Sequence, residues 1–329
     1  MNLRHCLAAG AFACAAVALY SQAPPAASSA PATPLPWAFP FDPNAPKQAP
    51  PPDDKELRHV PNSSRALTQK QILDGFNPPD WHQDFTQSTP EIVAHGRPQD
   101  IRACGYCHLP NGQGRPENAS LAGLPAAYIA AQVSDYRNGL RKSSEPNMGP
   151  PAAMLKLAQA SNDAEVKTAA EYFSKLKYKP WIKVVESKTA PKTRVATGML
   201  VALEGTSEPL GQRIVETAQS LEATENRDDA SPFVAYVPVG SIKKGEALVT
   251  TGGSGKTLRC SICHGTDLKG LGNVPFLAGR SPSYLIRQLY DIKTGNRHGP
   301  WSPLMKEAVA NLTTEDMVNI AAYVSSRTP

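Results

Sequence analysis

The sequence contains no apolar run long enough to cross a membrane as a helix, which takes about 20 residues. One shorter apolar stretch, from Leu7 to Tyr20, follows Arg4 and leads into small residues, a pattern typical of a secretory signal peptide. We expect cleavage after Ala23, which would leave an exported, periplasmic protein that is soluble or peripheral to the membrane. A lipid anchor on Cys14 is the alternative, and it is disfavoured because Ala11 to Ala13 make a poor lipoprotein site.

Dense runs of Lys or Arg are also missing, and the formal net charge is only +5. Loss of Arg4 with the signal would lower this charge to 5 − 1 = +4, so nucleic-acid binding has no support. Residues 240–329 are the only clearly basic part, with 11 Lys and Arg against 6 Asp and Glu. This excess favours electrostatic steering of that part toward an acidic partner.

No cysteine is left over to form a disulfide. Of the 6 cysteines, Cys6 and Cys14 would leave with the signal, and all the others belong to two C-x-x-C-H motifs. The disulfide framework common in exported proteins is therefore excluded. The motifs consist of Cys104, Cys107 and His108, and of Cys260, Cys263 and His264.

A C-x-x-C-H motif is the attachment sequence of a c-type haem, in which two thiols bind the porphyrin and the imidazole binds its iron. In a helix, positions i, i+3 and i+4 share one face, so the three side chains can meet one porphyrin. Zinc sites are the competing interpretation. A structural zinc ion takes four ligands, whereas each motif supplies three and a distant Met. The sequence therefore predicts two covalently bound haem c groups, each with its iron.

An internal repeat frames the two motifs: residues 104–176 overlay residues 260–327. Each motif His is followed 13 residues later by Leu-Ala-Gly. The chain therefore holds the same haem-binding module twice. The equivalent pairs are Leu121 and Leu277, Tyr128 and Tyr284, Gln132 and Gln288, Asp135 and Asp291, Gly139 and Gly295, and Arg141 and Arg297.

Both copies have helical patterns. Apolar residues recur at helical spacing from Tyr128 to Gly139 and from Tyr284 to Gly295. Closing helices follow, the second with a capping box formed by Thr313 and Asp316. A shorter helical candidate, LTQKQILDGF, begins at Leu67.

The regions outside the repeat differ in composition. Residues 24–52 are rich in Pro and Ala and favour an extended tether, while four segments within 181–239 are rich in β-branched residues and predict β-hairpins. The fold class that follows is mainly α. We divide the chain into a signal peptide (1–23), a Pro-rich arm (24–66), a first haem domain with an N-terminal extension (67–178), a β-rich insert (179–239) and a second haem domain (240–329).

The sixth ligand of each iron decides between a carrier and a catalyst. Met154 and Met305 both lie 18 residues before a repeat-equivalent Tyr, and a thioether opposite His favours a low-spin carrier with a raised potential. Met148 is the rival at the first haem, because it lies 9 residues after Gly139 while Met305 lies 10 after Gly295. We favour Met154, since a loop containing Gly149, Pro150 and Pro151 can absorb the difference.

Three further histidines, His82, His95 and His298, lie near a motif or a Met loop. Each could act as a ligand in place of Met, although an imidazole at such positions is more often a surface or capping group. Pro275 is positioned to offer its carbonyl to the second ring nitrogen of His264, a contact that fixes the imidazole.

With these residues, the chain resembles the class I c-type cytochromes, and the paired modules are similar to bacterial diheme carriers of the c-four kind. The resemblance implies two class I cytochrome c domains joined by the β-rich insert. It also implies His108 and His264 as proximal ligands, Met154 and Met305 as distal ligands, and Pro275 as the support of its histidine. In the first copy, Ala119 stands where that Pro is expected.

Electron transfer, one electron at a time, is the function that follows from this resemblance. The partners would be redox proteins such as a dehydrogenase, a quinol complex or a terminal oxidase, and the chain could be a mobile carrier or a fixed cytochrome subunit. A diheme peroxidase, with one open iron site, is the alternative from another class. Two Met residues at matching positions argue against it.

Overall fold

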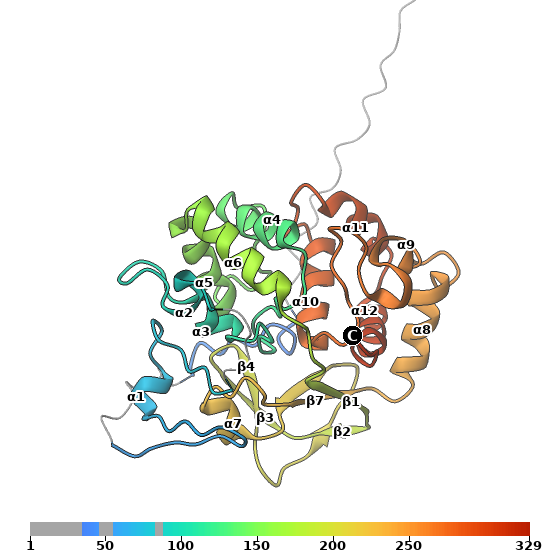
Figure 1. Cartoon of the computed structure of the whole chain (residues 1–329). Helices are drawn as coiled ribbons and strands as arrows, with labels where there is room; N and C mark the ends of the chain where they lie inside the picture. The colour runs from blue at the N-terminus through green and yellow to red at the C-terminus, as the bar shows by residue number, and fades with distance from the viewer. Residues whose placement is uncertain (1–34, 46–54, 83–87) are drawn as a thin grey trace, which may run out of the picture. The chain divides into compact units, whose positions relative to one another are not determined.

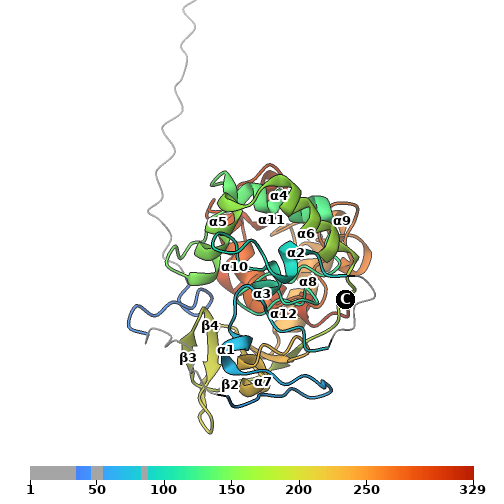
Figure 2. The same cartoon turned by 60° about the vertical axis from the view of Figure 1, so that its left-hand side comes forward.

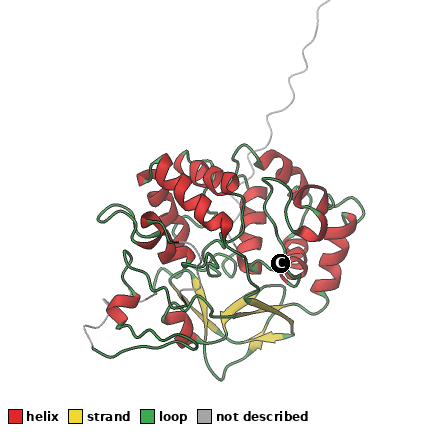
Figure 3. Cartoon of the chain, viewed as in Figure 1, coloured by secondary structure: helices red, strands yellow, loops and turns green. Residues whose placement is uncertain are grey.

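The computed structural model describes residues 35–45, 55–82 and 88–329. The signal-peptide and lipid-anchor predictions lie outside these residues. The helices of the two modules lie above a lower layer that holds the strands and two short helices, Gln69–Ile72 and Leu221–Glu225 (Figures 1 and 3). Among the described residues, no helix is both long and apolar enough to cross a membrane.

The first module is helical, as the repeat predicts. Helix α4 packs against both α5 and α6, and Ile129, Phe173 and Leu124 are among the side chains buried between the helices. Helix α4 ends before Gly139, whose φ of 69° favours glycine. The elements are α2 (Glu91–Ala94), α3 (Cys104–His108), α4 (Ala126–Arg137), α5 (Gly149–Ala160) and α6 (Asp163–Lys175).

The second module repeats this arrangement, and the helix before its motif is longer than α2 in the first. That helix, α8, packs along α12, where Gly245 is required because a Cβ would overlap the backbone of Asn319. The side chains of Ile286, Val318 and Ala321 are fully buried in the resulting core. The elements are α8 (Ser241–Thr251), α9 (Ser261–His264), the 3-10 turn η1 (Thr266–Leu268), α10 (Pro282–Lys293), α11 (Ser302–Val309) and α12 (Thr314–Ser325).

The ends of the closing helices follow ordinary capping chemistry. Thr313 and Asp316 form the predicted capping box at the start of α12. Asn162 and Glu165 form a second box at the start of α6. Each box satisfies two backbone N–H groups that the helix itself cannot bond.

The predicted loop before Met154 is a helix instead. Gly149, Pro150 and Pro151 open helix α5, with Pro in its first turn, where the missing N–H costs no hydrogen bond and the fixed φ suits the helix. Met154 therefore lies on α5 and not on the closing helix α6. Met305 likewise lies on a short helix of its own, α11.

In the insert, the predicted strand segments are strands, but most of their pairing differs from the predicted hairpins. Strand β7 lies between β1, to which it is parallel, and β6, to which it is antiparallel. Only β3 and β4 form a tight hairpin, through Thr197 and Gly198. The strands are β1 (Ile182–Glu186), β2 (Thr189–Ala190), β3 (Thr193–Ala196), β4 (Met199–Ala202), β5 (Glu208–Pro209), β6 (Val215–Ala218) and β7 (Phe233–Val237), with helix α7 (Leu221–Glu225) between β6 and β7.

The described part of the Pro-rich arm is packed and is not an extended tether. Ala38 and Phe39 are buried in the core of the second module, and the Phe39 ring meets the ring of Tyr290 edge-on at 5.7 Å. Arg287 donates a hydrogen bond to the Ala38 carbonyl at 3.0 Å. Composition misleads here because a few apolar side chains suffice to anchor an otherwise Pro-rich segment.

The helical candidate that begins at Leu67 is shorter than its pattern suggests. Helix α1 spans only Gln69–Ile72 and is capped by Thr68. It stops because Asp74 accepts a hydrogen bond from the backbone N–H of Phe76 at 2.8 Å, a local turn that competes with the helix. The chain then bonds to the first haem module, where Ala103 donates to the Gly75 carbonyl at 2.9 Å. Figure 2 shows α1 in the lower part of the molecule, at the level of α7 and the strands.

Candidate haem-binding sites

Each C-x-x-C-H motif opens onto a large, mainly apolar cavity. The first encloses about 1410 Å³ of space, partly open to solvent, and the second about 1890 Å³. The predicted residues of each module line its own cavity: Cys104, Cys107, His108 and Met154 in the first, and Cys260, Cys263, His264 and Met305 in the second.

The two motif histidines are fixed in the same way. Nδ1 of His108 lies 2.8 Å from the Ala119 carbonyl, and Nδ1 of His264 lies 2.8 Å from the Pro275 carbonyl. A carbonyl can only accept, so Nδ1 carries the proton and Nε2 keeps its lone pair. The contact uses a backbone oxygen, which Ala119 supplies at the same distance as Pro275.

Burial favours the uncharged form of the first thiol and of the imidazole in each motif. It raises the pKa of the Cys104 thiol to about 12 and that of Cys260 to about 11, so neither is an activated thiolate of the kind that redox motifs use. Burial also lowers the pKa of His108 and of His264. A neutral imidazole is the form that binds a metal.

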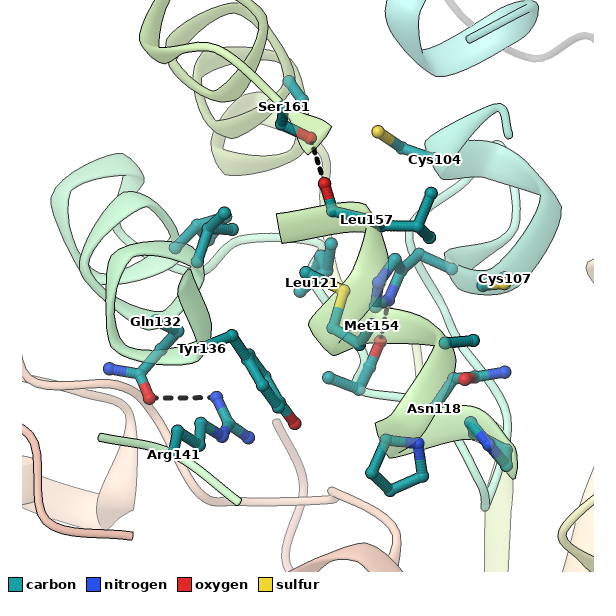
Figure 4. Close-up of a pocket in the computed structure, with 18 of the residues that line it drawn as sticks. Cys104, Cys107, Asn118, Leu121, Gln132, Tyr136, Arg141, Met154, Leu157 and Ser161 are labelled. Carbon is teal, nitrogen blue, oxygen red and sulfur yellow. Dashed lines mark hydrogen bonds between the residues drawn. The ribbon is translucent and has the colours of Figure 1, made fainter. Parts of the chain in front are cut away.

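The two candidate methionines of the first module lie in different surroundings. Met154 extends from α5 into the pocket that also holds Cys104 and Cys107 (Figure 4). Met148 is 0% exposed and belongs to the apolar core that also contains Phe39 and Ile214. It is not among the residues that line the described cavity.

The three other histidines make contacts of their own. Nε2 of His82 lies 2.8 Å from a carboxylate oxygen of Asp228, and Nδ1 of His95 lies 2.9 Å from Asn77. His298 is exposed, with Nδ1 2.9 Å from the Gly295 carbonyl. Within the described residues, none of the three lines either cavity.

The cavities share a wall, which sequence reasoning did not foresee. Tyr128, Gln132, Tyr284 and Gln288 line both of them. These side chains come from α4 and α10, so the wall is the contact between the modules. In the sequence, only the equal spacing of the Tyr, Gln and Arg residues in the two repeats points to this wall.

Two arginines cross this wall in a symmetric pattern. Arg141 donates to Tyr284 and to Gln288 of the second module, both at 2.9 Å. Arg297 donates to Tyr128 at 2.9 Å and to Gln132 at 2.8 Å, both in the first.

The backbone beside the two arginines repeats this symmetry. Lys142 donates to Asn296 at 2.7 Å, and His298 donates to Leu140 at 2.8 Å. Together these bonds relate the two modules by an approximate two-fold axis.

The buried arginines shift the acids around them. Burial alone would raise the pKa of Tyr284, but Arg141, Arg297 and Arg280 lower it to about 8. Burial raises the pKa of Asp291 to about 6 despite hydrogen bonds from Ser144. The wall is therefore a polar, positively charged strip between two apolar cavities. It would attract acidic groups of a molecule bound at the edge of either cavity.

The two helices that carry the C-x-x-C-H motifs differ in what covers them. Arg227 of the insert lies 3.9 Å above the Tyr106 ring inside the first motif, and Asn111 donates to the Asp229 carbonyl at 2.5 Å. In the second motif, Ile262 takes the place of Tyr106 and is 57% exposed.

No protein-family model matches the sequence. Cytochrome c-554(548) of Halomonas halodenitrificans is 40% identical over 76 residues, which cover 23% of this chain and 92% of that protein. The chain belongs to the diheme class I c-type cytochromes. The apolar cavities, the paired thiols and the oriented histidines fit the haem c that membership implies.

Two further comparisons give this diheme cytochrome longer matches. The thiosulfate dehydrogenase electron acceptor of Thiomonas intermedia is 26% identical over 234 residues, 70% of this chain and 81% of that protein. A solved thiosulfate dehydrogenase from Marichromatium purpuratum aligns with 25% identity and a TM-score of 0.47 over 70% of this chain. The cytochrome spans only 38% of that longer chain.

Proposed function

We propose that the chain is a periplasmic diheme cytochrome that passes electrons one at a time between redox partners. The sulfurs of Cys104 and Cys107, and of Cys260 and Cys263, would attach the haems. His108 and Met154 would be the axial ligands of the first iron, and His264 and Met305 those of the second. When bound, haem c supplies an iron that changes between ferrous and ferric states.

One observation carries this proposal: each cavity is lined by one motif His and one Met from a separate helix. Nε2 of each histidine keeps its lone pair, and each thioether lies on a helix that packs against the Tyr and Gln helix of its own module, α5 against α4 and α11 against α10. A peroxidase needs one open or displaceable position at an iron. A full ligand set in both modules favours a carrier.

Absorption and EPR spectra of the purified holoprotein test this assignment. We expect two low-spin, six-coordinate sites and an electron uptake of two per chain in a reductive titration, because both modules supply a complete ligand pair. A high-spin ferric signal in the untreated protein, together with rapid turnover of hydrogen peroxide, would contradict the carrier and favour the peroxidase.

For the partner, we propose an acidic surface on a dehydrogenase that docks on the second module. The relative from Thiomonas intermedia is named as the electron acceptor of such an enzyme. Residues 240–329 are the basic part of the chain, and Ile262 and Leu258 are 57% and 51% exposed beside the second motif. The equivalent face of the first motif is covered by the insert. A quinol complex or a terminal oxidase would serve as the opposite partner.

A pull-down from periplasm under gentle conditions, with Ile262→Asp beside the native chain, tests this docking face. We expect the substitution to weaken capture of the dehydrogenase about tenfold, roughly 1.4 kcal/mol, because a negative charge meets an acidic partner. Leu203→Asp is the matched control, since Leu203 is 39% exposed in the insert. Equal capture of the dehydrogenase by both variants would mean that the docking face lies elsewhere on the chain.

A further inference from the structure

Away from both cavities, His82 meets two consecutive carboxylates of the insert. Its Nε2 lies 2.8 Å from Oδ1 of Asp228 and 3.6 Å from Oδ1 of Asp229. His82 ends the described N-terminal segment 55–82, and the two aspartates follow α7. The cluster therefore joins two parts of the chain that are far apart in sequence.

One oxygen of this cluster has no hydrogen-bond partner. The Asp229 side chain is 2% exposed, and its Oδ1, which faces His82, accepts no hydrogen bond from any described residue. A buried carboxylate oxygen without a donor costs on the order of 1–3 kcal/mol or more. This oxygen faces the imidazole of His82, which is another potential ligand. The arrangement indicates that the cluster binds a further group that contacts this oxygen.

The donor atoms have the separations that a small metal ion requires. The three candidate ligand atoms all lie within 4.8 Å of one another. Ligands about 2.0–2.1 Å from a tetrahedral zinc ion lie roughly 3.3–3.5 Å apart. The distances from Nε2 of His82 to the two carboxylate oxygens, 2.8 and 3.6 Å, fall on either side of that range. Small side-chain shifts would therefore bring all three atoms to the spacing of zinc ligands.

The segments that carry the ligands are held in place by other bonds. Nε1 of Trp81 donates to the Asn226 carbonyl at 2.8 Å, which ties the residue before His82 to the loop of the aspartates. Oδ1 of Asp228 also accepts from the backbone of Ala230 at 2.9 Å. Metal sites depend on such outer contacts to orient their ligands.

The charges around the cluster favour a cation. The carboxylates of Asp80 and Asp228 repel a negative charge on Asp229, and His82 attracts it. Arg65 bonds to the Asp80 carbonyl at 2.6 Å and adds one positive charge nearby. Three carboxylates thus face one imidazole and one guanidinium.

We propose that His82, Asp228 and Asp229 bind a divalent transition-metal ion, of which zinc is the best example. Nε2 of His82 and one oxygen of each carboxylate would be the ligands, with water in the fourth position. Imidazole nitrogen combined with carboxylate oxygens suits zinc better than calcium. Binding releases to solvent the Nε2 proton that now lies between His82 and Asp228, and no electron is transferred.

Such an ion would fasten segment 55–82 to the insert next to the first haem attachment helix. Asp229 already contacts that region, since its carbonyl accepts from Asn111. A ligand that binds only the folded chain stabilises it in proportion to the logarithm of its concentration. The expected consequence is a zinc-dependent rise in the melting temperature of the holoprotein.

Equilibrium dialysis of the untagged holoprotein against zinc at about pH 7, followed by elemental analysis, is the direct test. We expect one zinc ion per chain, and loss of this ion in His82→Gln and in Asp229→Asn. His298→Gln is the matched control, because His298 is an exposed histidine outside the cluster. It should keep both the zinc ion and the rise in melting temperature.

Further measurements on the native chain do not depend on how the variants fold. Zinc binding should weaken at least tenfold at about pH 5.5, where a free imidazole is mostly protonated, and calcium should not compete. Absence of zinc at 100 times the protein concentration would overturn the proposal, as would equal binding by the native chain and Asp229→Asn. Preference for calcium over zinc would overturn the assigned ligand set.

Discussion

The two haem modules have the same frame but different surroundings. The wall between them is symmetric, with Arg141 and Arg297 each bonding to the Tyr and Gln of the opposite module. Their outer faces are not alike: Arg227 covers Tyr106 in the first motif, while Ile262 in the second is 57% exposed. A repeated haem pocket can thus be preserved while its two copies acquire different contacts with other parts of the chain and with partners.

A second difference lies at the edge of the shared wall. Asp291 accepts hydrogen bonds from the backbone and the hydroxyl of Ser144 at 2.9 and 2.6 Å. The residue equivalent to Ser144 in the other copy is Pro300, which has neither donor. Asp135 instead faces Gly299, where a Cβ would overlap its carboxylate. The symmetric wall is therefore bounded by two acids in unequal environments.

The largest expected effect comes from removing one module's attachment sulfurs. Cys260→Ala with Cys263→Ala should leave a holoprotein with the mass of a single haem, and Cys104→Ala with Cys107→Ala should do the same for the other site, because each motif attaches its own group. Mass spectrometry of the denatured protein gives the count. A variant that keeps both haems, or loses both, would contradict the independence of the two modules.

The next comparison separates two methionines of the first module. Met154→Ala should abolish the sulfur-to-iron charge-transfer band of that haem and lower its potential, since Met154 lines the cavity. Met148→Ala should leave the band unchanged but lower the free energy of unfolding by about 2–5 kcal/mol, because it empties a fully buried site. Optical redox titration and chemical denaturation measure the two effects.

Met305→Ala is the matched control in the second module. It should remove the band of the second haem and leave the first unchanged. If Met148→Ala is the variant that loses the band, Met148 is the distal ligand, and the distal side of the first cavity is arranged differently in the haem-bound protein. The shared spacing of Met154 and Met305 would then not identify the ligand.

A smaller effect is expected at Asp291. The pKa of Asp291 in the folded protein is about 6, above the ordinary value of 3.8. The protonated carboxyl therefore stabilises the fold fully below about pH 3.8, and this stabilisation is lost as the pH rises through about 6. Asp291→Asn does not ionise. The free energy of unfolding of this variant, relative to that of the native chain, should rise by on the order of 1–3 kcal/mol between about pH 4 and about pH 8.

Denaturant unfolding of both proteins at the two pH values measures this difference. The altered bonds to Ser144 affect the variant equally at both, so the comparison isolates the ionisation. A difference that does not change with pH would mean that Asp291 titrates normally in the folded protein.

The sequence predicted much of the haem modules and little of what surrounds them. Helical spacing and the repeat were enough to predict the helices around Tyr128 and Tyr284, and the capping box at Thr313 was read directly from its residues. These features depend on contacts within a few turns of chain. The family membership, which rests on the same motifs, was also predicted correctly.

The features that the sequence did not predict depend on distant contacts. The parallel pairing of β1 with β7 joins residues about 50 positions apart. The cross-module bonds of Arg141 and Arg297 required knowledge of how residues 179–239 fold back. The burial of Phe39 and the cover of Arg227 over Tyr106 are of the same kind. Local pattern carries no information on which remote surface such a side chain meets.

The smallest expected effect concerns Pro275, where the modules differ in sequence but not in geometry. The carbonyls of Pro275 and Ala119 both lie 2.8 Å from Nδ1 of their histidines. If the backbone oxygen alone orients the imidazole, Pro275→Ala makes the second module resemble the first. We then expect unchanged spectra and a loss of only about 0.4–1 kcal/mol in the free energy of unfolding, because the unfolded chain gains freedom.

Redox titration of Pro275→Ala, with the first haem as internal reference, tests this equivalence. The potential of the second haem should stay where it is in the native chain, since the carbonyl that accepts from His264 is retained. A marked shift confined to the second haem would mean that the proline ring itself acts on the site, by contact with the porphyrin or by limiting the motion of the loop. Ala119 would then be a functional difference between the modules and not a neutral one.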